Sequence, residues 1–426
     1  MAVAGGKIQE LVDVAIVGGG AAGLVTAIFA ARRRPEWTVT ILDGARHLGA
    51  KILVAGGGRC NVTNRVVSAA DFHGGSPHVI KRILAAFPAE QTAAFFREIG
   101  VELHEEEHGK LFPDTNRARS VLDALLSEAD RCGVHIRTDH RVLSIERGEA
   151  GFRIETPAAT LTARHVVLAT GGRSLPKTGS DGLGYELARA LGHTLIPTTP
   201  ALVPLLLAGE FHAPLSGISQ DVELTVSATG TKPVRVRGAL LWTHFGISGP
   251  AVLDVSRHWH RARLEQREVS VTVNFLPGDD FAAAEQRLLA AVWAQPRAVL
   301  RGLLARWLPV RVADAMATAL GITRMLPMAH LSKEIRRKLI HALIAWPLPV
   351  IDSRGYSHAE ATAGGVPMNE IDPTTMASRV CPGLFLAGEI LDVDGRIGGF
   401  NFQWAWSSGW VAAAGLAQRD DREQAE

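Results

Sequence analysis

A glycine turn near the N-terminus has the spacing that binds the diphosphate of a dinucleotide. Gly18, Gly20 and Gly23 follow the short apolar run of residues 12–17 in a G-x-G-x-x-G pattern. The first glycine permits a tight turn, the second lets backbone N–H groups approach a pyrophosphate, and the third lets a helix close on the strand. The N-terminus of that helix would present free N–H groups and a partial positive charge to the anion.

An acidic residue completes this first constellation. Asp43 stands twenty positions beyond Gly23, directly after a second apolar stretch at residues 38–42, and Pro35 ends the helix between the two strands. A carboxylate there can accept the ribose 2′-OH and would repel a 2′-phosphate. The segment therefore predicts a β-α-β unit that holds an ADP moiety without that phosphate.

Two further glycine-rich turns favour FAD over NAD. Gly388 and Glu389 follow an apolar strand and lead to Gly398-Gly399, where a last helix begins near Asn401. A carboxylate beside such a helix start suits a ribityl hydroxyl and the rest of a pyrophosphate, and a nicotinamide dinucleotide needs no such distant site. A surface turn with a capped helix is the alternative. The buried strand at residues 166–169 ends in a third turn, which is expected near the adenosine half of the cofactor.

The pattern of apolar and polar residues in the rest of the chain predicts an α/β protein with an interrupted nucleotide-binding domain. Residues 200–275 alternate between apolar and polar positions, which is typical of an antiparallel sheet or barrel. Helical periodicity is expected at residues 77–99, 117–132, 280–345 and 401–418, and strands at 135–137, 141–146 and 152–155. We expect a Rossmann-like FAD-binding domain (1–196 and 352–426), a β-barrel-like domain (197–279 and 328–351) and a helical subdomain (280–327).

Three longer motifs resemble one family. Residues 49–64 (GAKILVAGGGRCNVTN) and 388–406 (GEILDVDGRIGGFNFQWAW) look like the BaiN/RdsA-type NAD(P)/FAD-dependent oxidoreductases, which include aminoacetone-oxidase-like members. Residues 176–185 resemble a third block, with Leu183-Gly184 as a departure from its usual form. The resemblance covers nearly the whole chain. It implies an FAD-binding Rossmann-like domain interrupted by a β-barrel and a small helical domain, with the loop at residues 56–64 against the flavin.

The expected cofactor-binding residues belong to these turns and to the loop. They are Gly18, Gly20, Ala21, Ala22, Gly23, Asp43, Gly44, Lys51, Gly58, Arg59, Cys60, Asn61, Thr63, Asn64, Thr170, Gly171, Gly172, Gly388, Glu389, Asp394, Gly398, Gly399, Phe400 and Asn401.

Several of these side chains have two interpretations. Lys51 and Arg59 could lie by the pyrophosphate or the flavin, or be solvated surface charges. Asn61 and Thr63 could bond to the isoalloxazine edge or cap a turn. Cys60 has no second cysteine within seventy residues, so a buried packing role is favoured over a redox thiol.

The catalytic acid or base is not identified by any motif. His244 and His358 are candidates by residue type, with a structural or surface role as the favoured alternative. Trp404 and Trp406 could line a substrate pocket and Gln403 could bond to the flavin, although core packing is expected of at least one tryptophan.

Net charge, cysteine spacing and the lack of long apolar runs restrict the kinds of partner that we expect. With 45 basic and 43 acidic residues the net charge is +2, which gives no electrostatic case for nucleic acid or an anionic membrane. Three widely spaced cysteines argue against disulfides or a zinc site, and neither a signal peptide nor an apolar run of 18 residues is present. We expect a soluble cytoplasmic protein that binds no metal; its oligomeric state stays open.

The leading hypothesis is an FAD-dependent oxidoreductase. Hydride would pass between a small organic substrate and flavin N5, with NAD(P)H or oxygen as the second partner. No second G-x-G-x-x-G follows a strand, so NAD(P)H would bind transiently at the flavin, which gives weight to an oxidase. The alternatives are a flavoprotein acting on RNA, for which the arginine-rich residues 297–338 could form a basic face, and an FAD-binding sensor without turnover.

Overall fold

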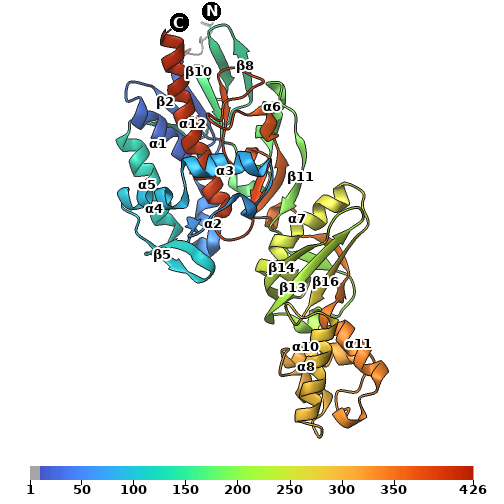
Figure 1. Cartoon of the computed structure of the whole chain (residues 1–426). Coiled ribbons are helices and arrows are strands. Elements are labelled where there is room, and N and C mark those ends of the chain that lie inside the picture. Colours follow the sequence, from blue (N-terminus) through green and yellow to red (C-terminus); the bar gives the residue numbers. More distant parts are fainter. Residues whose placement is uncertain (1–9, 426) are drawn as a thin grey trace, which may run out of the picture. The chain divides into compact units, whose positions relative to one another are not determined.

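The chain forms two compact units. The computed structural model describes residues 10–425 (Figure 1). Unit 1 takes the described residues up to Thr198 and from Glu360 onward, and unit 2 takes Thr199–Ala359. The chain leaves unit 1 along β11 (Ile196–Ala201) and re-enters it just before β19 (Ala361–Gly365).

The sheet of unit 1 carries parallel strands whose carboxyl ends stand level. Val17 pairs with Leu42 on one side and with Leu168 on the other, and Leu168 also pairs with Leu386. In sheet order the parallel strands are β7 (His135–Arg137), β2 (Val39–Leu42), β1 (Glu10–Val17), β10 (Thr160–Leu168) and β20 (Leu384–Leu386). The Rossmann-like α/β fold expected from the sequence is therefore present.

Shorter antiparallel strands complete unit 1. Beside the first half of β10, the sheet is extended by β9 (Gly151–Glu155) and β8 (Ser144–Gly148), so the strand expected at 141–146 begins at Ser144. Three small sheets lie apart from it. One pairs β11 with β19. The others pair β4 (Phe72–Gly74) with β21 (Val393–Gly395), and β6 (Lys110–Pro113) with β3 (Thr63–Asn64) and β5 (Leu103–Glu106).

Helices bury the parallel strands on both faces. β2 is buried throughout, as expected of a strand that helices cover on both sides. Helix α1 (Ala21–Arg33) packs against α12 (Phe400–Ala425) and against α5 (Ala118–Arg131). A Cβ at Gly409 of α12 would lie 2.8 Å from the carbonyl oxygen of Ala22, so glycine lets the two helices close on one another.

Three helix predictions needed correction. The single helix expected at 77–99 is two, α3 (Pro77–Ala86) and α4 (Ala89–Glu98), because Pro88 lacks an N–H and disfavours helical geometry in Phe87. The stretch after Gly49 contains α2 (Ala50–Gly58), whose last turn leaves helical geometry at Ala55. The last helix extends to Ala425, beyond the expected end at 418.

Unit 2 combines one sheet with two groups of helices. Its strands, in sheet order, are β17 (Trp346–Leu348), β16 (Val269–Asn274), β13 (Ser219–Ala228), β14 (Val234–Thr243), β15 (Gly246–Ser248), β12 (Leu205–Leu207) and β18 (Val350–Ser353). Neighbouring strands of this sheet pair antiparallel, as the alternating pattern predicted.

One helix of unit 2 was missed. Helix α7 (Pro250–Leu264) interrupts the region expected to be all strand, and it packs on β13, β14 and β16. Its signals were present in the sequence: Pro250 at the first helical position, and buried Val252, Val255 and Trp259 at helical spacing. Flanking strands with alternating patterns obscured this change of period.

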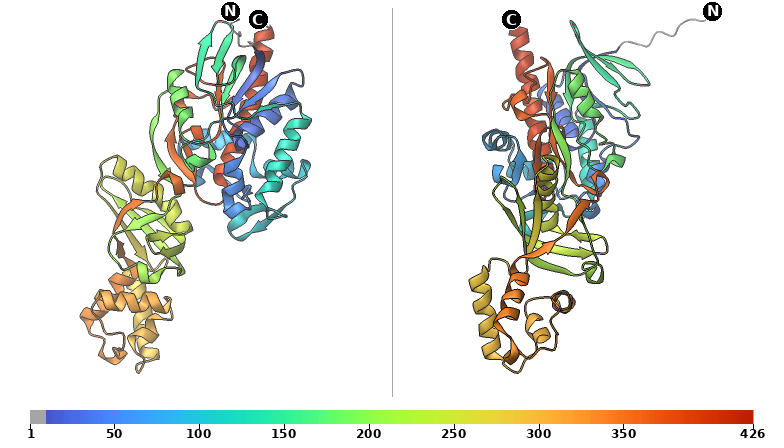
Figure 2. Two further views of the ribbon diagram at one scale, coloured as in Figure 1. Left: turned by 180° about the vertical axis from the view of Figure 1, so that it is seen from behind. Right: turned by 90° about the vertical axis from the view of Figure 1, so that its right-hand side faces the viewer.

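The other helices of unit 2 gather beyond one end of its sheet, as Figure 2 shows from two sides. They are α8 (Phe281–Ala294), α9 (Leu300–Leu304), α10 (Val310–Ala319) and α11 (Lys333–Ile344). These helices lie within the helical periodicity expected at residues 280–345. Across residues 10–425, no helix combines the length and the hydropathy that a bilayer crossing requires.

Close packing of α12 provides the first test. A Cβ at Gly415 would lie 2.2 Å from the carbonyl oxygen of Thr375, which is backbone and cannot rotate away. We expect Gly415→Ala to lower the free energy of unfolding by about 1–3 kcal/mol, measured by urea denaturation. In Gly302→Ala, on α9, the new Cβ meets no heavy atom of the described residues within 4 Å, so that control should unfold at the same or a higher urea concentration. Equal behaviour of the two variants would contradict this packing.

Candidate cofactor site

The level strand ends bring the three predicted turns together. Gly18 follows β1, Asp43 follows β2, and Thr170 and Gly388 follow β10 and β20 within two residues of their ends. In open parallel sheets, ligands bind outside the carboxyl ends where the strand order reverses from one side to the other. That point lies between β1 and β10, at the glycine turn.

The three glycines of this turn have the geometry that their spacing predicted. Gly18 has φ of +105°, and a Cβ there would lie 2.5 Å from the carbonyl oxygen of Ala169. A Cβ at Gly23 would lie 1.9 Å from the carbonyl oxygen of Gly18, so α1 closes directly on the strand end. Around Gly20, by contrast, no heavy atom among residues 10–425 lies within 4 Å of such a Cβ.

The N-terminus of α1 is therefore open to a ligand. Gly20 is its N-cap, and no side chain of the described residues caps it. The first N–H groups of a helix have no partner inside the helix, and they carry partial positive charge. This end of α1 can hold an anion such as a pyrophosphate.

Asp43 is oriented by the same turn. Its Oδ2 accepts the Gly19 N–H at 2.7 Å and its Oδ1 accepts the Ala45 N–H at 2.8 Å. Each carboxylate oxygen keeps a lone pair for a further donor. Asp43 is half-buried, and Gly44 beside it is exposed. The carboxylate is thus fixed next to the glycine turn, where a ribose hydroxyl could donate to it.

The C-terminal segment touches the first turn of α1. A Cβ at Gly388, whose φ is +79°, would lie 2.8 Å from the Cβ of Ala22. The Gly388 N–H donates to Ser408 Oγ at 2.9 Å, and Trp404 Nε1 donates to the Gly388 carbonyl at 3.1 Å. Helix α12 therefore holds this turn in place from behind, and segments far apart in sequence border one region.

Glu389 lies at the centre of a polar network. Its Oε2 is 2.6 Å from Lys51 Nζ, while its Oε1 accepts Ser174 Oγ at 2.7 Å and the Thr362 N–H at 2.8 Å. Lys51 also donates to Ser174 and Ser180. Ser174 and Thr362 are fully buried, whereas the Lys51 and Glu389 side chains are 27% and 17% exposed, so the ion pair is partly screened by solvent.

This network includes residues that sequence reasoning missed. Ser180 lay inside the motif at residues 176–185, so that motif carried its signal. Thr362 follows the long interruption in β19, and nothing in the sequence connected it to Glu389. The turn at Gly171-Gly172 packs on the same groups, since a Cβ at Gly171 would lie 2.6 Å from Ser180 Oγ and one at Gly172 would lie 2.4 Å from Thr362 Oγ1.

The loop at residues 56–64 packs against the start of α12. Asn64 Nδ2 donates to the Gly398 carbonyl at 3.1 Å, and a Cβ at Gly399 would lie 2.6 Å from the carbonyl oxygen of Thr63. Asn401 bonds to both the N–H and the carbonyl of Gly395. Asp394 and Phe400 are buried beside them. The hydrogen bonds of Asn401 thus stabilise the turn that precedes α12.

Several polar candidates are already bound within the protein. Thr63 Oγ1 donates to Gln403 Oε1 at 2.6 Å, and Gln403 Nε2 donates to the Phe87 carbonyl, to Thr92 and to Ser407. Gln403 is fully buried and its amide N–H groups already have acceptors within the protein, so the structure does not favour a hydrogen bond from them to the flavin.

The tryptophans of α12 are core residues. Trp404 and Trp406 are 1% and 0% exposed, and Trp406 Nε1 donates to the Val62 carbonyl at 2.8 Å. Core packing was expected of at least one of them; both have this role, and neither lines a substrate pocket.

Arg59 is held by neighbours of its own. Its Nη1 donates to Glu106 Oε1 at 2.6 Å, and its guanidinium lies 4.1 Å from the centre of the Phe112 ring. The hydrogen bond from Arg59 lowers the pKa of Glu106. The Arg59 side chain is 40% exposed, so the guanidinium remains accessible from solvent. Gly58 precedes it with φ of +84°.

The two histidine candidates belong to unit 2. His244 is exposed next to Phe245, and its ring centroid lies 5.1 Å from that of the phenylalanine. His358 is exposed, with Nδ1 3.3 Å from the Arg354 carbonyl oxygen. Neither has, among the described residues, a carboxylate partner that would orient it as an acid or base.

Two buried polar atoms lack partners where a cofactor is expected. Asn61 Oδ1 and Thr170 Oγ1 have no hydrogen bond within the described part of the chain. An unmet buried hydrogen bond costs about 1–3 kcal/mol, so a polar ligand that bonds to either atom would be stabilised there. Together with the open helix end at Gly20 and the oriented Asp43, they fit an ADP-containing dinucleotide that reaches from the glycine turn toward the loop at residues 56–64.

The glycine turn yields a paired prediction. Gly20→Ala should leave the unfolding free energy of the apoprotein within about 1 kcal/mol, because the new Cβ meets open space and the backbone conformation suits alanine. It should weaken FAD binding by about tenfold or more, which is about 1.4 kcal/mol, because that space lies where the pyrophosphate would approach. Both quantities follow from urea denaturation and from flavin fluorescence titration.

Gly23→Ala is the matched control for this prediction. Its Cβ would meet the Gly18 carbonyl at 1.9 Å, so the apoprotein itself should be destabilised. Unaltered FAD affinity in Gly20→Ala would exclude this helix end as the anion site.

Cys60 provides a test of thiol chemistry. The side chain is fully buried in a backbone conformation of φ +63°, and burial raises the pKa of the thiol to about 12. The thiol stays protonated at neutral pH, and the thiolate is the reactive form. We expect iodoacetamide at pH 8 to leave Cys60 unlabelled in the folded protein and to label it in urea, as read by peptide mass spectrometry. Rapid labelling of the folded protein would restore the redox interpretation.

Comparison with known proteins identifies the family of this chain. The chain matches the HI0933-like protein Rossmann domain over residues 12–415. It is 35% identical over 406 residues to a 3-dehydro-bile acid delta(4,6)-reductase of Clostridium scindens, covering 95% of this chain and 99% of the relative. It is 36% identical over 413 residues to the ribosomal RNA dihydrouridine synthase of Escherichia coli, covering 96% and 98%.

A solved structure supports the fold alone. The FrdA chain of quinol fumarate reductase from E. coli superposes with a TM-score of 0.52 at 17% identity, over 98% of this chain and 72% of that one. The motifs at residues 49–64 and 388–406, the Rossmann-like sheet and the matches over nearly the full length agree, and this chain belongs to the HI0933-like (BaiN/RdsA) family of FAD-dependent flavin oxidoreductases.

Proposed function

We propose that this protein reduces a carbon–carbon double bond conjugated to a carbonyl group, with FAD as the bound cofactor and NAD(P)H as the electron donor. One observation carries the proposal: two full-length relatives with different substrates have names that imply this same bond change. A delta(4,6)-reductase of a 3-dehydro bile acid saturates bonds near the 3-keto group. Dihydrouridine differs from uridine by two hydrogens across a ring double bond next to a carbonyl.

The cofactor residues of unit 1 would divide their tasks along the dinucleotide. The N-terminus of α1 at Gly20 would hold the pyrophosphate, and Asp43 would hold the adenosine ribose. Glu389, paired with Lys51, would face the ribityl side. The side-chain oxygen Oδ1 of Asn61, which has no partner within the described residues, would accept a hydrogen bond from the isoalloxazine ring of the flavin. Bound FAD would supply hydride transfer, which no side chain of this chain can perform.

The names of the two relatives favour a reductase, whereas the absence of a second Rossmann fingerprint by itself gave weight to an oxidase. The sequence shows no second Rossmann fingerprint, so NAD(P)H would bind and leave before the substrate takes the same space. This alternation needs no dedicated nicotinamide domain.

The test uses purified holoprotein without oxygen. NADPH and NADH are each mixed with the protein, and bleaching of the flavin absorbance is followed by stopped flow. A 3-keto-4-ene steroid or uridine-containing RNA is then added, and products are analysed by mass spectrometry. We expect reoxidation of the flavin by at least one substrate, which gains the mass of two hydrogens.

Two controls make this test decisive. A saturated 3-keto steroid and RNA made with dihydrouridine should leave the flavin reduced, because they lack the double bond. Flavin that neither nicotinamide bleaches, or that only air reoxidises with release of peroxide, would contradict the reductase proposal.

A further inference from the structure

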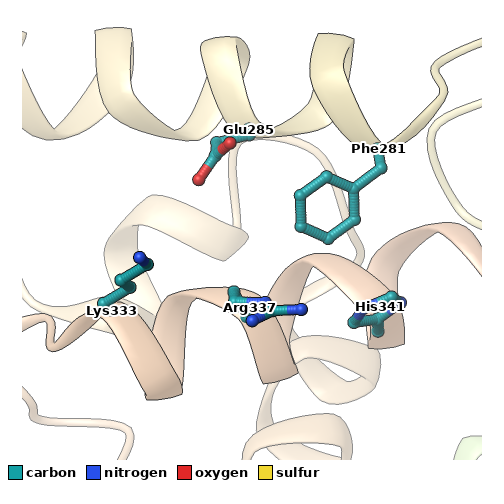
Figure 3. Close-up of a pocket in the computed structure, with 5 residues that line it drawn as sticks. All are labelled: Phe281, Glu285, Lys333, Arg337 and His341. Carbon is teal, nitrogen blue, oxygen red and sulfur yellow. The ribbon is translucent and has the colours of Figure 1, made fainter.

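A pocket in unit 2 has a lining unlike that of the cofactor site. Helices α8 and α11 border a cavity of about 460 Å³ lined by Phe281, Glu285, Lys333, Arg337 and His341 (Figure 3). The three basic residues are spaced at i, i+4 and i+8, so they lie along one face of α11. In Figure 3 this row faces Phe281 and Glu285 of α8 across the cavity.

The positive charges of this row are not neutralised by the described part of the protein. Glu285 is 3.0 Å from Arg336 Nε, so that carboxylate already has a partner. Lys333 and Arg337 are exposed, and neither makes a hydrogen bond or ion pair with any residue between 10 and 425. Lys333 is the first residue of α11, where the helix dipole disfavours a cation, and Arg337 four residues on adds repulsion. An anion in the pocket would relieve both effects.

Helix α8 also carries two aromatic side chains, one of them in the lining of the pocket. Phe281 is half-buried, with its ring centroid 5.0 Å from that of His341. Trp293, on the same helix α8, is 84% exposed. Exposed aromatic rings beside cations are the usual combination for nucleobases and the phosphates between them.

The charge excess extends beyond the pocket. Residues 281–344 contain 10 Lys and Arg against 3 Asp and Glu, whereas the rest of the chain contains 35 against 40. Asp314 is shared by Arg301 and Arg324, but Arg297 and Arg306 are exposed and have no partner among the described residues. The net charge of +2 for the whole chain therefore conceals a basic segment at residues 281–344. A near-neutral net charge does not exclude nucleic acid as a ligand of that segment.

We propose that residues 281–344 bind single-stranded RNA and that the pocket between α8 and α11 holds one nucleotide. Lys333 and Arg337 contact its phosphate, and its base lies against Phe281. This inference rests on the proposed function: the bound RNA would supply uracil, which carries a double bond conjugated to a carbonyl, as the group to be reduced. A dinucleotide such as NADPH has similar chemistry, but it would leave the exposed cations outside the pocket without a role.

The experiment measures RNA binding without turnover. A fluorescein-labelled single-stranded oligouridylate is titrated with full-length holoprotein at several KCl concentrations, and fluorescence anisotropy gives the affinity. The double variant Lys333→Glu/Arg337→Glu should bind about tenfold or more weakly at low salt. The slope of log K against log [KCl] should fall by about 0.7, for the one phosphate that the variant no longer neutralises. Phe281→Ala should weaken binding without changing the slope.

A matched control separates the site from overall charge. Lys232→Glu/Arg235→Glu changes the net charge equally, at exposed positions in and beside β14 of the same unit. It should bind RNA nearly as well as the natural protein. Flavin absorbance and the melting temperature establish that each variant is folded.

Three results would overturn the inference: no binding of the oligouridylate at low salt, equal weakening in the control variant, or displacement of the RNA by NADPH at matched phosphate concentration. Its failure is distinguishable from that of the reductase proposal. Reduction of a steroid enone without RNA binding would refute only this inference, whereas RNA bound at the pocket by a protein that reduces neither substrate would refute only the reductase.

Discussion

Unit 1 depends on two backbone approaches at the end of β1 that only glycine permits. The carbonyl of Gly18 lies where a side chain at Gly23 would stand, and Gly18 itself lies against the carbonyl of Ala169. These approaches fix the N-terminus of α1 at the level where β1, β2, β10 and β20 all end. The free N–H groups of the helix, Asp43 and Glu389 consequently border one region, and the anion site follows from the packing of the backbone.

The long interruption of unit 1 leaves this arrangement intact. β10 pairs with β1 along its length, and β20 pairs in parallel with the last residues of β10. The returning chain therefore extends a sheet whose register is fixed by β1 and β10. Gly388 then meets Ala22, and Glu389 meets Lys51. The ion pair joins residues 338 positions apart, and the buried Ser174 and Thr362 hold the Glu389 carboxylate in place by hydrogen bonds.

The two units divide the chemistry by charge. The region at the strand ends of unit 1 combines neutral backbone donors with fixed carboxylates, which suits one enclosed dinucleotide. The helices at residues 281–344 carry exposed cations, the half-buried ring of Phe281 and the exposed ring of Trp293, which suit the single-stranded RNA that we propose as their ligand.

The sequence by itself determined the features set by local spacing: the glycine turn, Asp43 at the end of β2, the buried strands and the family motifs. Such features need only a few consecutive residues. Tertiary structure decided which way side chains point and which partners they find. Gln403, Trp404 and Trp406 face the core because α12 packs on α1 and on the loop before β3, and Lys51 pairs with Glu389 because β20 joins β10. Helix α7 escaped prediction because its period was masked by the strands that it covers.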